Sequence, residues 1–253
     1  MNTMLEKFCN KLVYGDCLEV MQELPDDCID MVLCDLPYGL TNQNKWDVII
    51  PFDQLWSQYK RITRKNAAIV LTAAQPFASQ LIMSNPKMFR YDLIWEKNKS
   101  TGFLNANKMP LRKHEHILVF YRQLPVYNPQ KTTGHKPVNS YTKHTSDGSN
   151  YGQTKTGIKG GGQTERHPTS ILKFDVVNND SQEKIHPTQK PVPLFEHLIK
   201  TYTVEGMTVL DNCSGSGTTI VACKNTNRNY IAIEANLNYY NNSLERLKNV
   251  RNS

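Results

Sequence analysis

Two short segments carry the residues of this chain that are best suited to chemistry. The first, Asp35-Leu36-Pro37-Tyr38-Gly39, follows an apolar run at residues 29–34 and places a carboxylate and an aromatic ring in a turn. The second, Asp211-Asn212-Cys213-Ser214-Gly215-Ser216-Gly217-Thr218-Thr219, follows an apolar run at residues 207–210. Glycines after a strand allow the tight backbone turn that lies beside a bound cofactor. We therefore expect the later segment to hold a cofactor and the earlier segment to hold a flat substrate.

An acidic residue follows the glycine turn at the distance that nucleotide-binding units use. Glu234 stands 23 positions after Asp211, at the end of another apolar run. In βαβ units, an acid about 20 residues beyond the turn binds the ribose of an adenosine group. The turn is not the dinucleotide fingerprint, because it starts on the strand with an acid, and it lacks the lysine of a phosphate-binding loop. The pattern favours an adenosine-containing cofactor, although a glycine turn alone is explained equally well as a plain tight turn.

Strand and helix patterns alternate along the chain and must position these segments. Apolar runs predict strands at residues 12–14, 29–34, 67–71, 91–95, 117–121, 208–210 and 230–233. Helical spacing predicts helices that begin near Pro51, Pro76 and Gln189, after the glycine turn, and after Asn236, which can cap the last helix. The alternation predicts an α/β fold with a doubly wound, mostly parallel sheet. Because the carboxyl ends of parallel strands meet at one edge, the two segments would face each other there.

The alternating pattern stops between residues 122 and 185. Glycine, serine, threonine, asparagine and lysine dominate there, and residues 127–173 contain seven Lys or Arg against two acids. This composition is also typical of a disordered linker, but we favour an insert that contacts a polyanion and orders on binding. We therefore expect a catalytic and cofactor-binding domain made of residues 1–121 and 186–253, interrupted by an insert at residues 122–185.

Composition limits the class of protein. The formal net charge of +7 suits a polyanionic partner. No apolar stretch approaches the roughly 18 residues of a membrane span, and the N-terminus lacks a secretion signal, so we expect a cytoplasmic protein without membrane association. Six cysteines without a C-x-x-C pair predict reduced core thiols. We expect no metal site, because His114-Glu115-His116 offers only a pair of histidines on one strand face without a third ligand.

Taken together, these motifs resemble the amino-group DNA methyltransferases, which move a methyl group from S-adenosylmethionine to N6 of adenine or N4 of cytosine. Residues 35–38 resemble the family's catalytic D-P-P-Y motif, residues 211–219 its cofactor loop, and residues 186–191 the helix-opening segment beside the methionine end of the cofactor. Gly15-Asp16 resembles the acidic turn near the adenine. The catalytic segment precedes the cofactor loop, which is the order of the family's β group. Residues 46–47, 51–52 and 112–116 are similar to those of phage and phage-like adenine methyltransferases.

The resemblance implies a role for each motif. The Asp35 carboxylate and the Leu36 carbonyl would accept the two hydrogens of a base amine, Tyr38 would stack on the base, and no covalent enzyme intermediate would form. The base would be flipped out of double-stranded DNA, with the insert as target-recognition region. The implied catalytic residues are Asp35, Leu36, Pro37 and Tyr38, and the implied cofactor-binding residues are Asp16, Thr188, Lys190, Asp211, Cys213, Gly215, Ser216, Gly217, Thr218 and Glu234.

Two positions depart from the family pattern. Leu36 replaces the first proline of D-P-P-Y, which keeps the backbone carbonyl but loses the ring that fixes φ. Asn212-Cys213 replaces Pro-Phe in the cofactor loop, which changes the packing expected against the adenine. Asp16, taken without the resemblance, is explained as readily by capping a turn.

These observations predict a site-specific DNA adenine-N6 methyltransferase that uses S-adenosylmethionine and belongs to restriction-modification chemistry in a bacterial or phage-infected cell. Asp35, rather than Ser, at the start of the motif favours adenine over cytosine. The alternatives are an N4-cytosine enzyme and a catalytically silent DNA-recognition subunit. Methylation of RNA or of a protein glutamine fits less well, because those enzymes usually begin the motif with Asn and have the cofactor loop upstream. The resemblance also makes a homodimer plausible.

Overall fold

The structure is a computed structural model that describes residues 3–39, 47–142, 157, 159–178 and 189–250. The chain divides into two compact units, one of Met1–Asn128 with Ser170–Ser253 and the other of Pro129–Thr169. The larger unit holds the two sequence segments that suggested chemistry. Its fold is therefore what positions the site.

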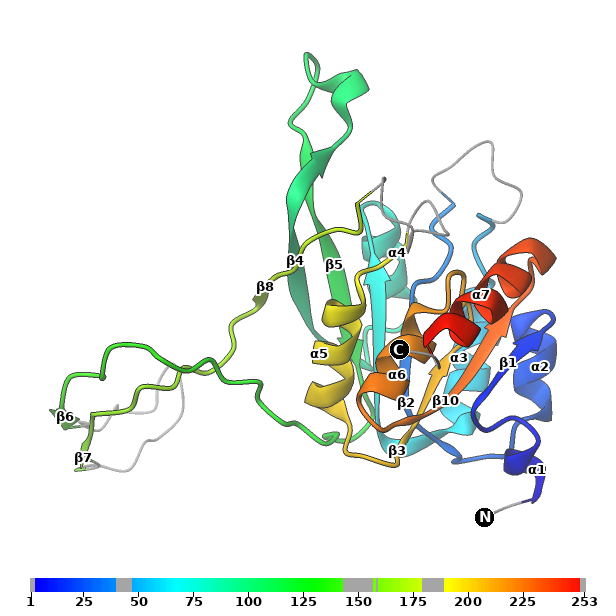
Figure 1. The fold of residues 1–253 in the computed structure, drawn as a ribbon, viewed down its shortest axis with the longest axis horizontal. Helices are drawn as coiled ribbons and strands as arrows, with labels where there is room; N and C mark the ends of the chain where they lie inside the picture. The colour runs from blue at the N-terminus through cyan, green and yellow to red at the C-terminus, as the bar shows by residue number, and fades with distance from the viewer. Residues whose placement is uncertain (1–2, 40–46, 143–156, 158, 179–188, 251–253) are drawn as a thin grey trace. The chain divides into compact units, whose positions relative to one another are not determined.

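An eight-stranded sheet forms the centre of the larger unit (Figure 1). Five neighbouring strands run parallel, and β5 runs antiparallel to its neighbours β3 and β4. The doubly wound, mostly parallel α/β fold expected from the alternating pattern is confirmed. In sheet order the strands are β1 (Lys11–Tyr14), β10 (Asn229–Glu234), β9 (Thr208–Asp211), β2 (Ile29–Cys34), β3 (Thr63–Ala73), β5 (Arg112–Phe120), β4 (Phe89–Thr101) and β8 (Ile171–Lys173).

Helices cover both faces of this sheet (Figure 1). Alternate residues of β2 explain why: Val32 and Cys34 face one apolar core, whereas Met31 and Leu33 face the other. The first core packs against α2 (Cys17–Glu23), α3 (Phe52–Ile62) and α4 (Phe77–Ser84), and the second against α5 (Val192–Tyr202), α6 (Thr218–Asn225) and α7 (Leu237–Val250). A single-turn helix, α1 (Thr3–Glu6), precedes β1.

The strand order brings the two segments together. Strand β9, from the end of the chain, lies beside β2, from its beginning, with Val209 opposite Met31 and Leu210 opposite Val32. Both strands run in the same direction, so the turns that follow them leave the same edge of the sheet. This is the position at which ligands bind in doubly wound sheets.

The last helix confirms a local prediction. The Asn236 Oδ1 accepts hydrogen bonds from the backbone N–H groups of Asn238 and Tyr239, at 3.0 and 3.2 Å. Asn236 thus caps α7 as its side-chain type suggested. Ser243 and Leu247 form part of the buried face of α7, whereas Leu237 is exposed.

Two features of the larger unit differ from the sequence-based pattern. Strands β4 and β5 form a long antiparallel hairpin, with a short 3-10 helix, η1 (Phe103–Asn105), at its tip. Antiparallel strands need only a short connection, so no α-helix of the kind that joins parallel strands lies between them. In addition, β8 pairs with β4 in the main sheet, although it lies within the stretch expected to be an insert.

The smaller unit contains little regular structure in its described residues. Strands β6 (Tyr141–Thr142) and β7 (Lys159–Gly160) form a two-stranded antiparallel sheet, and Thr132 pairs with Arg166 in an isolated bridge. The assignment of residues 122–185 to target recognition stays a prediction. In the described part of the chain, no helix combines the length and the apolar character needed to cross a bilayer.

Candidate active site

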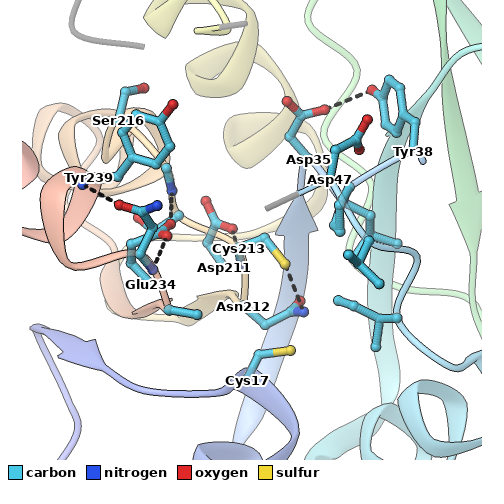
Figure 2. A pocket seen from close by; sticks show the side chains of 18 of the residues that line it. Cys17, Asp35, Tyr38, Asp47, Asp211, Asn212, Cys213, Ser216, Glu234 and Tyr239 are labelled. Carbon is cyan, nitrogen blue, oxygen red and sulfur yellow. Dashed lines mark hydrogen bonds between the residues drawn. The ribbon is translucent and has the colours of Figure 1, made fainter. Parts of the chain in front are cut away.

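A cavity of about 650 Å³ lies at the sheet edge where β1, β2, β9 and β10 end (Figure 2). Both sequence segments contribute to its wall, because their strands end at this edge. Most of the site residues implied by the sequence line this cavity together: Asp16, Asp35, Leu36, Pro37, Tyr38, Lys190, Asp211, Cys213, Gly215, Ser216, Thr218 and Glu234.

Two implied residues stand apart from that lining. Gly217 is not part of the cavity wall and instead precedes α6 with a left-handed backbone, φ +71°. Glycine adopts this conformation without the steric cost that a Cβ would add. Thr188 lies outside the described residues, as do His186 and Pro187 of the same motif.

Asp35 is held by three side chains. The Tyr38 hydroxyl donates to its Oδ1 at 2.7 Å, the Thr72 hydroxyl donates to the same oxygen, and the Lys190 ammonium donates to Oδ2 at 2.7 Å. The Asp35 side chain is 24% exposed while Lys190 is 6% exposed. The carboxylate is therefore fixed in orientation and still reaches the cavity.

The Lys190 ammonium bridges two carboxylates. Besides Asp35, it lies 3.3 Å from Glu115 Oε2, and the other oxygen of Glu115 accepts from Lys97. Burial lowers the pKa of Lys190, but the charges of Asp35 and Glu115 outweigh this effect and raise it. Burial likewise raises the pKa of Glu115, and the positive charges of Lys190 and Lys97 reverse this into a net lowering. Lys190 and Glu115 are thus both held in their charged forms, and basic and acidic residues alternate along the series Lys97, Glu115, Lys190 and Asp35.

Tyr38 contacts protein on both its ring and its hydroxyl. Its ring stacks on Phe77 with a centroid distance of 5.2 Å and an interplanar angle of 24°. Burial and the nearby Asp35 charge raise the pKa of Tyr38 well above its ordinary value, so the hydroxyl stays protonated and donates to Asp35. Stacking of Tyr38 on a base stays a prediction.

The glycine turn is shaped by the acid at its start. The Asp211 Oδ1 accepts from the Cys213 N–H at 3.1 Å, and its Oδ2 accepts from the Thr219 hydroxyl. Burial raises the pKa of Asp211 to about 7. Asp211 therefore orders both ends of the turn, and its charge is costly in this buried position.

Glu234 joins the glycine turn to the start of α7. Its Oε2 accepts from the Gly215 N–H at 2.7 Å, and its Oε1 accepts from the Asn236 N–H at 2.8 Å, as the dashed lines of Figure 2 indicate. Burial raises the pKa of Glu234. The carboxylate lies at the cavity wall and fixes the turn.

Asp16 combines the two readings open at the sequence level. Its Oδ1 accepts from the N–H groups of Leu18 and Glu19, at 2.8 and 3.2 Å, so it caps α2. It also lines the cavity. A helix cap and a ligand contact are compatible, because the cap uses a single carboxylate oxygen.

The two departures from the family pattern have structural partners. Leu36 is 4% exposed and packs in the core beneath the cavity, which gives its side chain a place that a proline ring would fill less completely. Asn212 is 1% exposed and accepts a hydrogen bond at 2.6 Å from the Tyr59 hydroxyl. The Asn212 side chain is thus committed to a buried partner, which explains a polar residue at this position.

Several lining residues were given no role at the site from the sequence. Glu115 was considered for metal binding and as part of the 112–116 resemblance, and the sequence signal that could have found its role is a charged residue two positions before the apolar run 117–120. The other cavity residues outside the implied set include Cys17, Asp47, Ile49, Gln189, Phe195, Ser214 and Tyr239. Asp47 accepts from the Gly39 N–H at 2.8 Å and so braces the turn that follows Asp35.

The cavity is compatible with S-adenosylmethionine. Its volume lies in the range of about 300–1,000 Å³ found for small-molecule sites. Ser214 Oγ is buried in the wall and has no hydrogen-bond partner among the described residues. A buried hydroxyl without a protein partner is expected where a ligand supplies one.

Comparison with known proteins gives the same picture. Residues 29–245 match the N6/N4 family model that is described as DNA methylase. The type II methyltransferase M.HpaI of Haemophilus parainfluenzae is 25% identical over 251 residues, covering 94% of this chain and 74% of the relative. M.BglII of Bacillus subtilis is 25% identical over 251 residues, covering 91% of this chain and 66% of the relative. This chain is thus shorter than these relatives.

Solved structures share the fold. The complex of M1.HpyAVI with SAM has a TM-score of 0.64 at 22% identity and covers 94% of this chain and 98% of that chain. The cytosine-N4-specific PvuII DNA methyltransferase has a TM-score of 0.69 at 15% identity and covers 96% and 90%. The family model matches most of the chain, and the two motifs line one cavity. This chain therefore belongs to the N6/N4 DNA methylase family and is a DNA methyltransferase whose cofactor is S-adenosylmethionine.

Proposed function

We propose that this methyltransferase acts on N6 of an adenine that is flipped out of double-stranded DNA. The observation that carries the proposal is the Asp35 carboxylate, which is fixed by Lys190 and Thr72 in the wall of the cavity that the glycine turn also lines. Asp, rather than Ser, at this position favours adenine. Enzymes that act on either base belong to the same family, so the choice between adenine and cytosine rests on this residue.

The residues around Asp35 fit activation of an aromatic amine. S-adenosylmethionine supplies a methyl group that is electrophilic because it is bonded to a sulfonium. The Asp35 carboxylate and the Leu36 carbonyl would accept the amine hydrogens and so direct the nitrogen lone pair toward that methyl. Holding the two reacting atoms in line supplies much of the rate, and the enzyme needs no covalent intermediate.

Tyr38 and Lys190 would serve Asp35 in different ways. Tyr38 donates to Asp35 and lines the cavity, so its ring would contact the base while its hydroxyl orders the carboxylate. The Lys190 ammonium lies 2.7 Å from the Asp35 Oδ2 and so holds that carboxylate oxygen in place. We therefore assign Lys190 to Asp35 first, and its contact with the methionine end of the cofactor stays a prediction.

The cofactor would lie along the remaining cavity wall. Asp16 and Glu234 are placed at the ends of β1 and β10, which are hydrogen-bonded neighbours, so an adenosine group could contact both. Ser214, Ser216 and Thr218 supply hydroxyl groups on the glycine turn. Recognition of the DNA sequence is assigned to residues 122–185, on the strength of their excess positive charge.

Nucleoside analysis tests the choice of base. The protein would be incubated with labelled cofactor and genomic DNA that lacks adenine and cytosine methylation, and the DNA digested to nucleosides. Label in N6-methyladenine is expected. Label confined to N4-methylcytosine would show the alternative enzyme, and titration calorimetry that detects no cofactor binding by folded protein would favour a silent recognition subunit.

A further inference from the structure

The tip of the β4–β5 hairpin has an unusual surface for a loop. Phe103 is 69% exposed, Leu104 fully exposed and Met109 57% exposed, so three large apolar side chains face solvent within seven residues. Apolar groups gathered on a surface and rimmed by charge commonly mark a binding site. In this part of the molecule a partner is therefore expected to cover them.

The charge around these side chains has a single sign. Residues 99–113, which we call the hairpin tip, contain Lys99, Lys108, Arg112 and Lys113 and no Asp or Glu. All four side chains are exposed. Lys113 lies 3.5 Å from Glu96 and Lys99 donates to Asn178, but both partners stand outside the tip. The tip thus complements a polyanion that also presents apolar surface.

The hairpin leaves the sheet at the edge that holds the active site. His116 of β5 lies opposite Ala73 of β3, and Thr72, the residue before Ala73, donates to Asp35. Arg112 precedes His116 by four residues, and because β5 runs antiparallel to β3, Arg112 lies about 13 Å beyond the end of β3. Figure 1 shows the hairpin rising past the ends of the neighbouring strands.

We propose that the hairpin tip grips duplex DNA beside the flipped-out base. A two-stranded ribbon fits the major groove of B-form DNA. Lys108 and Arg112 contact phosphates, and Phe103 and Leu104 contact the bases or sugars next to the vacated position, where the stack is open. This inference rests on the proposed action on a flipped base, and it adds a DNA-binding element outside residues 122–185.

A charge-reversal variant tests the phosphate contacts. K108E/R112E is compared with K60E/K87E, which changes the net charge equally with exposed lysines near the opposite edge of the sheet. Anisotropy with a labelled random-sequence duplex would be measured over a range of salt concentrations. K108E/R112E is expected to bind at least tenfold more weakly than K60E/K87E, with a salt slope lower by about two. Equal affinity and equal slope would overturn the proposal.

An apolar variant tests the other half of the tip. F103S/L104S is compared with M83S/V204S, which removes two exposed apolar side chains elsewhere on the larger unit. F103S/L104S is expected to lower kcat/KM on duplex DNA about tenfold and to leave cofactor affinity unchanged by calorimetry, whereas M83S/V204S should match the wild type. Equal kcat/KM for the two variants would overturn this half of the proposal.

Two further results separate this inference from its premise. Wild-type protein that binds the cofactor but methylates no DNA contradicts the proposed function. Wild-type protein that methylates DNA, with K108E/R112E as active and as tightly bound as its control, contradicts the hairpin proposal alone. Loss of binding to phosphatidylserine vesicles by K108E/R112E, with DNA affinity kept, would assign the tip to a membrane surface and also overturn it.

Discussion

The Lys190 Nζ lies 2.7 Å from the Asp35 Oδ2, although the two residues are 155 positions apart in the chain. This contact joins the segment before α5 to the turn after β2. It continues through Glu115 to Lys97, so the Asp35 carboxylate is the end of a partly buried series of alternating basic and acidic side chains. The charged groups of the site are therefore held in place by contacts between distant segments of the fold.

Replacing Asp35 should separate chemistry from cofactor binding. Asp35→Ala removes the group assigned to accept the amine hydrogens, so methyl transfer should fall below detection. The glycine turn does not depend on Asp35, so cofactor affinity by calorimetry should stay within a few fold. Turnover comparable to the wild type would contradict the assigned role.

Removing Lys190 should destabilise the fold through the charges it leaves behind. Lys190→Ala leaves Asp35 and Glu115 without their shared partner and should lower the free energy of unfolding by about 3 kcal/mol. In the double variant K190A/E115Q one of these charges is gone, so urea denaturation should show a smaller loss than the sum of the single effects. Additive effects would indicate that Lys190 and Glu115 are not coupled. Lys87→Ala serves as a control at an exposed lysine.

Burial of Asp211 predicts a pH dependence of stability. Its pKa is raised to about 7 in the folded state, against 3.8 for an ordinary aspartate. The unfolded chain therefore releases this proton first, and the Asp211 contribution to stability falls as the pH rises from about 4 to about 7, by up to about 4 kcal/mol. Asp211→Asn lacks this dependence. The unfolding free energy of the wild type should fall relative to that of D211N as the pH rises over that interval, and a constant difference in urea titrations at pH 5, 6 and 7 would refute the assignment.

Substitutions at two glycines with left-handed backbones can separate an effect on stability from an effect on cofactor binding. Gly217, φ +71°, lies in the cofactor turn, and Gly206, φ +80°, lies in a surface turn with no atom within 4 Å of an added Cβ. Either one replaced by alanine should cost about 1 kcal/mol, because the left-handed conformation is unfavourable for an L-residue. Only G217A should weaken cofactor binding, by disturbing the turn. Equal cofactor affinity in G206A and G217A would argue against a role for this turn.

Substitutions of Asp16 can separate its capping of α2 from its proposed contact with the cofactor. Asparagine caps helices as well as aspartate, so Asp16→Asn should keep the melting temperature close to that of the wild type. If the charge contacts the cofactor, D16N should still weaken cofactor binding severalfold. Asp16→Ala should lose the cap as well, at a cost of about 1 kcal/mol. Wild-type cofactor affinity for D16N would leave Asp16 with the capping role alone.

The sequence by itself determined those features that depend on near neighbours. Apolar runs predicted the strands around Val32 and Val209, because burial on both faces of the sheet leaves a near-continuous apolar stretch in the sequence. The cap at Asn236 and the left-handed turn at Gly217 follow from hydrogen bonds and sterics within a few residues. These features depend only on interactions between neighbouring residues, so the types of those residues are enough to predict them.

Tertiary structure alone decided what depends on distant partners. The placement of β9 beside β2, the bridging of Asp35 and Glu115 by Lys190, and the direction of the β4–β5 hairpin all join residues far apart in the chain. Periodicity reports whether a side chain is buried, but not which remote side chain it meets. Glu115 illustrates the limit: the sequence around it argued against a metal site but gave it no partner, and only the packing of β5 against the segment before α5 gave it a lysine as partner.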